Sequence, residues 1–296
     1  MLSEAGNPED GYFPRGKSVL RRVHGERAVG LFYGQRALAI GALNPVAFTG
    51  TIENTAGRMR PFKRLAHTGK VFEEIYFGTR AEADAALAFV HRLHKRVVGE
   101  MPADTGPYPA GTHYSAFDPE LMLWTLAVIA DSGPYFYELF VRKLSDDEHE
   151  ALWQDYVRFG ELFGMPREVA PPNYREFRAW WEETLASERM HLTAEAREVG
   201  YATAFEIPFS RSRQPAKRVH DLIMLGSLPP RVRELYGLGW SRAHEAAFRG
   251  IVTALRTSRP LTPKAIRRGR NGAEFDRVAR TEQERIDRGD YTPQAA

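Results

Sequence analysis

The stretch that decides the fold is residues 79–99, TRAEADAALAFVHRLHKRVVG. Thr79 and Glu82 have the residue types and spacing of a capping box, in which side chains and backbone N–H groups pair at a helix start. Gly99 is a residue type that commonly follows the end of a helix. The pattern between them therefore predicts one long helix over residues 80–98.

The apolar side of this helix contains a histidine. At 3.6 residues per turn, His94 lies in the middle of the apolar stripe and His91 lies at its edge. The stripe is formed by Ala83, Leu87, Val90 and Val97. A buried imidazole needs a partner, because an unsatisfied buried polar group costs about 1–3 kcal/mol. A metal or haem iron is one candidate partner for His94, and a backbone carbonyl or a carboxylate is the other.

Helix-start signals recur through the rest of the chain, whereas alternating strand patterns are scarce. The signals are Asn44-Pro45, Asp118-Pro119, Ser145 with Glu148, Asn173 with Glu176, Ser241, and Thr262-Pro263. The helix that begins after Asp118 is expected to end near residues 132–134, where Ser-Gly-Pro follows the apolar run. These patterns predict an all-α protein with one continuous core.

Composition places the chain among globular proteins. Its 296 residues are 43% hydrophobic and 27% charged, and the formal net charge of +3 is too small to mark a dedicated nucleic-acid binder. The absence of cysteine excludes disulfides, zinc–thiolate sites, iron–sulfur clusters and a cysteine nucleophile. The polar start lacks a signal-peptide pattern, and no apolar stretch reaches the ~20 residues of a membrane span. We therefore expect a cytoplasmic protein without a membrane segment.

The chain divides into three parts by composition. We expect a flexible N-terminal segment at residues 1–14, a helical domain at residues 15–268 and a polar tail at residues 269–296. The tail has few large apolar residues to offset its ordering entropy, so a solvated tail is expected whose removal leaves the thermal midpoint unchanged. Residues 259–270 carry five basic residues and no acidic one. This stretch is interpreted as a charged surface, with nucleic-acid contact as the alternative.

A basic cluster precedes the helix of residues 80–98. It contains Arg58, Arg60, Lys63 and Arg64, followed by His67 and Thr68. At helical spacing Arg64, His67 and Thr68 share one face. An arginine and a hydroxyl beside a histidine can hold an anion, a haem propionate or a polarised oxygen ligand. The alternative is a basic helix face in water.

Five segments in this order resemble a known oxygenase family. They are RLAHT (64–68), YFG (76–78), HKRVVG (94–99), YSAFDPELMLW (114–124) and LPPRVRELYGLGW (228–240). The family is that of the mycophenolic acid pathway oxygenase and the catalytic domain of rubber oxygenase, the latex clearing protein. The resemblance extends over roughly residues 15–268.

The resemblance implies a single globin-like helical domain that binds haem b, iron protoporphyrin IX. His94 matches the family's proximal histidine, and Arg64 and Thr68 match a distal arginine and threonine. His67 stands where rubber oxygenase has a lysine that can occupy the sixth coordination position. The implied function is a haem-dependent oxidoreductase or oxygenase that acts on a small, largely apolar organic substrate with dioxygen or peroxide.

Two positions depart from the family pattern. Asn44-Pro45 stands where many relatives have His-Pro, and Leu126 replaces the histidine of a Trp-Val-His segment. These departures motivate an alternative function, a non-catalytic helical protein that binds haem or another ligand. A second alternative is a nucleic-acid or partner-binding protein that uses residues 259–270.

Overall fold

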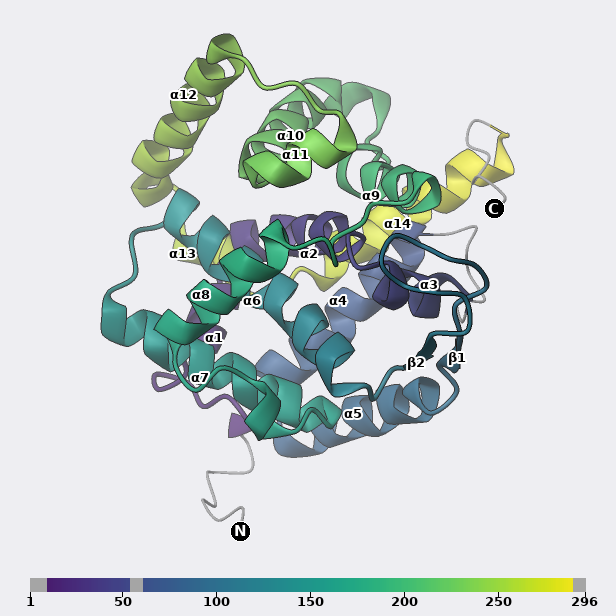
Figure 1. The fold of residues 1–296 in the computed structure, drawn as a ribbon. Helices are drawn as coiled ribbons and strands as arrows, with labels where there is room; N and C mark the ends of the chain where they lie inside the picture. Colours follow the sequence, from purple (N-terminus) through teal and green to yellow (C-terminus); the bar gives the residue numbers. More distant parts are fainter. Residues whose placement is uncertain (1–9, 54–60, 290–296) are drawn as a thin grey trace.

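Helices make up nearly all regular structure in the computed structural model, which describes residues 10–53 and 61–289 (Figure 1). The all-α prediction is therefore confirmed. The helices are α1 Val19–His24, α2 Arg27–Gly41, α3 Pro45–Glu53, α4 Pro61–Phe77, α5 Arg80–His94, α6 Pro119–Phe140, α7 Asp146–Phe163, α8 Tyr174–Ala186, α9 Ala194–Phe205, α10 Gln214–Ser227, α11 Pro230–Tyr236, α12 Arg242–Ser258, α13 Lys264–Arg267 and α14 Gly272–Asp287. Arg58 and Arg60 lie outside the described residues. No helix in the described part of the chain is long and apolar enough to cross a membrane.

Most of the predicted helix starts are confirmed. Thr79 with Glu82 and Ser145 with Glu148 form capping boxes, and the Asp118 carboxylate accepts hydrogen bonds from the start of α6. Helix α5 ends at His94 rather than at Val98, because residues 98–100 leave the helix to form a strand. This strand, β1 Val98–Glu100, pairs antiparallel with β2 His113–Ser115.

Helix α6 continues past the point where it was predicted to stop. Pro134 lies inside it, although proline removes one helical hydrogen bond and costs about 3 kcal/mol in a helix interior. The turn beyond it is retained because Phe136, Tyr137 and Phe140 are buried in the core. Tertiary packing therefore overrides the local stop signal.

Helices α2 and α6 lie together at the centre of the fold, with α10, α11 and α12 on one side and α5 and α7 on the other (Figure 1). Arg36 of α2 is 3% exposed and donates to Asp131 and Ser132 of α6 at 2.7 and 2.8 Å. Its Nε donates to the backbone oxygen of Ser227 in α10 at 2.9 Å. The central pair of helices is thus joined by charge as well as by apolar packing.

The predicted solvated tail is wrong for residues 271–287, because α14 packs along α4. Glu282 is 1% exposed and accepts hydrogen bonds from the backbone N–H groups of Phe62 and Lys63 at 3.2 and 2.8 Å. The ring of Phe275 fills the space beside Gly69. Polar capping and one aromatic contact therefore replace the large apolar area that the tail lacks. Removal of residues 271–296 is expected to destabilise the fold.

The predicted flexible segment at residues 1–14 needs a similar correction in its described part, residues 10–14. Phe13 is fully buried, and its ring lies edge-on to Tyr76 of α4 at 6.1 Å between centroids. A phenyl ring buried in this way anchors the chain ahead of α1. The helical domain therefore extends at least to Phe13.

The Glu282 contact gives a stability test. Glu282→Gln removes a charged acceptor from the first turn of α4 and is expected to lower the free energy of unfolding by about 1–2 kcal/mol. Urea denaturation followed by circular dichroism measures this change. Glu284→Gln, at an exposed position of the same helix, is the matched control and should stay within about 0.5 kcal/mol of the unchanged protein. Equal stability of the two variants would contradict the capping role.

Candidate active-site cavity

One large cavity runs through the helical core. Its volume is about 1300 Å³, and most of the side chains that line it are apolar. It extends from the C-terminal end of α5 to α13 and is bordered by α2, α4, α6 and α10. A site for one small ligand typically has about 300–1,000 Å³, so this cavity has room for more than one bound group.

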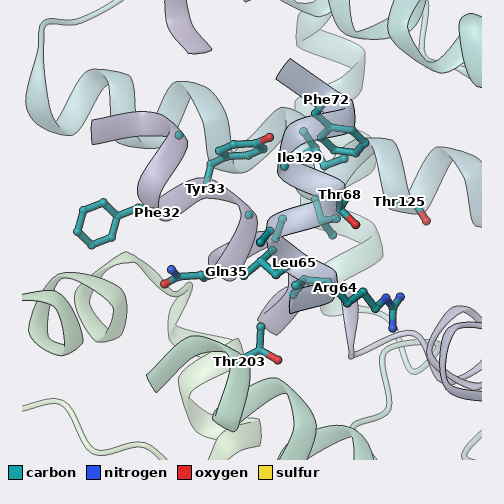
Figure 2. A pocket seen from close by; sticks show the side chains of 18 of the residues that line it. Phe32, Tyr33, Gln35, Arg64, Leu65, Thr68, Phe72, Thr125, Ile129 and Thr203 are labelled. Carbon is teal, nitrogen blue, oxygen red and sulfur yellow. The ribbon is translucent and has the colours of Figure 1, made fainter. Parts of the chain in front are cut away.

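Helix α4 supplies one wall of the cavity. Figure 2 shows Arg64, Leu65, Thr68 and Phe72 of this helix, together with Tyr33 and Gln35 of α2. His67 also lines the cavity, and its ring lies edge-on to Phe89 of α5 at 5.6 Å. Residues three and four apart share a helix face, which is why the structure brings Arg64, His67 and Thr68 to the same wall, as their spacing predicts.

Arg64 stands in an unusual environment for a guanidinium group. Its side chain is exposed, yet the surrounding protein desolvates it and lowers its pKa. Arg64 lines the cavity, so part of its exposed surface faces the cavity, and protein atoms still surround the guanidinium group. Arg64 forms no ion pair with any described residue. Its donors therefore remain available to an anion or an oxygen ligand in the cavity.

His94 lines the cavity at the end of α5. The ring is half-buried and lies 6.0 Å from the ring of Phe117 and 6.2 Å from that of Phe163. Its Nδ1 atom is buried without a hydrogen-bond partner. Burial and the neighbouring His91 lower the pKa of His94, which favours the neutral form of the ring. Neutral imidazole is the form that binds a metal.

The neighbouring His91 is placed differently. It is half-buried on α5 with Nε2 unpartnered, but it is not among the residues that line the cavity. The apolar stripe predicted for this helix is buried at Ala83, Leu87 and Val90. His94 was predicted to lie in the middle of this stripe. Because α5 ends at His94, His94 lies instead at the edge of the core.

A second polar group on the cavity wall had no signal in the sequence. His220 of α10 is 7% exposed; its Nε2 lies 2.7 Å from Gln35 Oε1 and its Nδ1 lies 3.1 Å from an Asp221 oxygen. Its ring stacks on Phe32 at 5.2 Å. Gln35 and His220 are 185 positions apart in the chain, so no local pattern could pair them. The side-chain polar atoms of Gln35 and His220 therefore all have hydrogen-bond partners within the protein.

The two departures from the family pattern have different surroundings. Leu126 is buried and lines the cavity, so an apolar side chain replaces a titratable one there. Asn44 is buried at the start of α3, where its side-chain oxygen accepts a hydrogen bond from Ala47 N at 3.0 Å. Asn44 thus serves as a helix cap, and only Leu126 changes the cavity wall.

Two of the cavity residues are of the types that could hold a haem. No group of three or more His, Asp or Glu within residues 10–53 and 61–289 is arranged to hold a metal ion. A haem iron needs only one or two protein ligands, because the porphyrin supplies the rest. The unpartnered Nδ1 of His94 and the guanidinium of Arg64, which forms no ion pair with a described residue, are groups that could hold an iron and an anionic propionate respectively.

Comparison with known proteins supports a family assignment. An uncharacterized protein of Mycobacterium bovis and one of Mycobacterium tuberculosis are each 28% identical over 205 residues, which is 69% of this chain and 76% of each relative. No solved structure matches this chain significantly. The family described as ER-bound oxygenase mpaB/B'/rubber oxygenase, catalytic domain, matches residues 21–257. The chain belongs to this family of oxygenase catalytic domains.

Proposed function

We propose that this protein is a haem b-dependent oxygenase that acts on a small, largely apolar organic molecule with dioxygen or a peroxide as oxidant. The observation that carries the proposal is His94, a histidine with an unpartnered buried nitrogen at the wall of a large apolar cavity. The family membership supports oxygenase activity, and the haem and the substrate class are inferences from the cavity.

Each polar residue of the wall has a proposed role. His94 holds the iron of the haem, which when bound supplies the chemistry of oxygen or peroxide activation. Arg64 and Thr68 donate hydrogen bonds to a propionate, to the oxidant or to a polar atom of the substrate. His67 would ligate the haem iron as a second protein ligand, or would hold and transfer a proton beside it.

The apolar wall supports the substrate class. Trp124, Leu126 and Ile129 of α6 line the cavity, and the indole N–H of Trp124 is occupied by the backbone oxygen of Gly41 at 3.1 Å. This surface offers dispersion contacts and excludes water from the reacting atoms. Leu126 cannot transfer a proton, so this part of the wall supplies no acid or base.

The nucleic-acid alternative receives less support. Arg259 and Arg268 of the basic stretch are bound to Glu26 at 2.9 and 2.8 Å, and Glu26 is 2% exposed. Arginines held in this way are not free to contact phosphates. The non-catalytic alternative is favoured by Leu126 alone and is separated from the proposal by turnover of a test substrate.

The assignment of His94 is tested by haem content. His94→Ala is expected to lose most of its haem, because it removes the only cavity-lining ring with an unpartnered buried nitrogen among the described residues. His91→Ala, which changes a histidine outside the cavity, should retain most of it. The Soret band and the iron-to-protein ratio of purified protein measure the difference. Equal haem content in the two variants would rule out the assignment.

The distal role of His67 is tested by the spin state of the iron. With His67 as the sixth ligand, the purified ferric protein is expected to be low-spin and to bind cyanide slowly, because His67 must leave first. His67→Ala is then expected to be high-spin or water-ligated and to bind cyanide faster. Electron paramagnetic resonance and stopped-flow spectroscopy measure both. An unchanged spin state with intact haem would exclude coordination and leave the proton-transfer role.

A further inference from the structure

The end of the cavity remote from His94 has a distinct composition. It is formed by α10, the C-terminal end of α12, the short 3₁₀ turn Arg259–Leu261 and α13, which Figure 1 shows well away from α5. Its lining includes Val219, Leu255, Ser258, Thr262, Ile266 and Arg267. An apolar lumen therefore ends at hydroxyl groups and a guanidinium group.

Positive charge is concentrated around this end. Residues 246–273 carry seven basic residues and no acidic residue. They are Arg249, Arg256, Arg259, Lys264, Arg267, Arg268 and Arg270. Glu26 of the opposing chain segment neutralises part of this charge by pairing with Arg259 and Arg268.

A second carboxylate faces the same region. Burial raises the pKa of Glu73, while the backbone N–H of Asn271 and the charges of Arg270 and Arg27 act in the opposite direction. Three carboxylates lie near this end of the cavity, Glu26, Glu73 and Glu274, and the last is paired with Arg277. The guanidinium groups near them are those of Arg27, Arg259, Arg267, Arg268 and Arg270. The local balance stays positive.

Arg267 is set apart from the other guanidinium groups at this end by a buried atom without a partner. It is half-buried, lines the cavity and forms no ion pair with any described residue. Its Nε is buried without a hydrogen-bond partner. Among the described residues that line the cavity, His94 and Arg267 are the two with such an atom, one at each end. A buried, unpartnered donor on a charged group favours an anionic ligand.

Arg27 lies close enough to act with it. Arg27 also lines the cavity, and its guanidinium lies against Gly269, two residues beyond Arg267 in the chain. A guanidinium offers a planar fork of donors that matches carboxylate and phosphate oxygens. Two arginines at one end of an apolar space are the arrangement expected for the charged head of an amphipathic molecule.

We propose that the α13 end of the cavity binds the anionic head group, a carboxylate or a phosphate, of an amphipathic ligand whose apolar body extends toward α5. Arg267 donates to the head group, and Arg27 adds a second positive charge. The volume of about 1300 Å³ leaves space for this ligand beside a haem held at His94. The binding site stands by itself, and its identification as the substrate site rests on the proposed function.

Binding of three C10 ligands tests the proposal. Isothermal titration calorimetry of the full chain as purified compares decanoate, decyl phosphate and 1-decanol, all below their aggregation limits. The two anions are expected to bind about tenfold more tightly than the alcohol, because only they engage the guanidinium groups. The ratio of decanoate to decyl phosphate affinity identifies which head group the site prefers.

The variants localise the effect. Arg267→Gln is expected to remove the preference for anions and to leave decanol affinity within about twofold. Arg27→Gln should weaken anion binding to a smaller extent, and it provides an independent measurement if Arg267→Gln does not fold. Arg256→Gln, at an exposed position on α12 outside the cavity, is the matched control and should bind all three ligands as the unchanged protein does.

Several outcomes would overturn the proposal. One is equal affinity for decanoate and decanol, and another is an unaltered preference in Arg267→Gln. Binding to anionic vesicles or to duplex DNA without saturable binding of decanoate would assign the positive charge to an outer surface instead. Haem content is measured on the same samples, so a protein without haem that prefers anions would refute only the proposed function. A haem-containing protein without that preference would refute only this inference.

Discussion

The buried Arg36–Asp131 ion pair is the interaction on which the arrangement of the helices depends. Arg36 joins α2 to α6 and α10, and Asp131 accepts a second hydrogen bond from Arg178 of α8 at 2.5 Å. Removing one partner of such a pair costs about 3–5 kcal/mol, because a charge is left uncompensated in the core. The network also fixes the rotation of α2. With that rotation set, Gln35 reaches His220, and other side chains of α2 face the cavity.

The elements that could be predicted from the sequence are those that local chemistry determines. Thr79, Asp118 and Ser145 cap helices through atoms a few residues away, so their residue types suffice. Helix α6 beyond Pro134 and helix α14 could not be predicted, because each depends on a partner distant in sequence. The carboxylate of Glu282 meets backbone N–H groups more than two hundred positions earlier. From the sequence alone this contact is invisible, so the polar segment that forms α14 is predicted to be solvated.

The candidate site divides in the same way. Arg64, His67 and Thr68 were predictable as a group because helical spacing alone puts them on one wall. The Gln35–His220 contact was not predictable, nor was the isolation of Arg267. The basic stretch at residues 259–270 looks uniform in sequence, but Glu26 pairs with two of its arginines, and Arg267 alone of its arginines keeps a buried Nε without a partner. Which of these arginines has a partner depends on the folded position of Glu26, so it cannot be predicted from the local sequence.

The state of hydrogen bonding separates the structural polar groups of the cavity from the binding groups. Gln35 and His220 satisfy each other, so they stabilise the folded protein without a ligand. His94 Nδ1 and Arg267 Nε are buried and unpartnered, and each costs free energy that a bound group can recover. Anything that binds the folded state alone also raises its stability. These two atoms lie at opposite ends of the cavity, where we propose a haem near α5 and an anionic head group near α13.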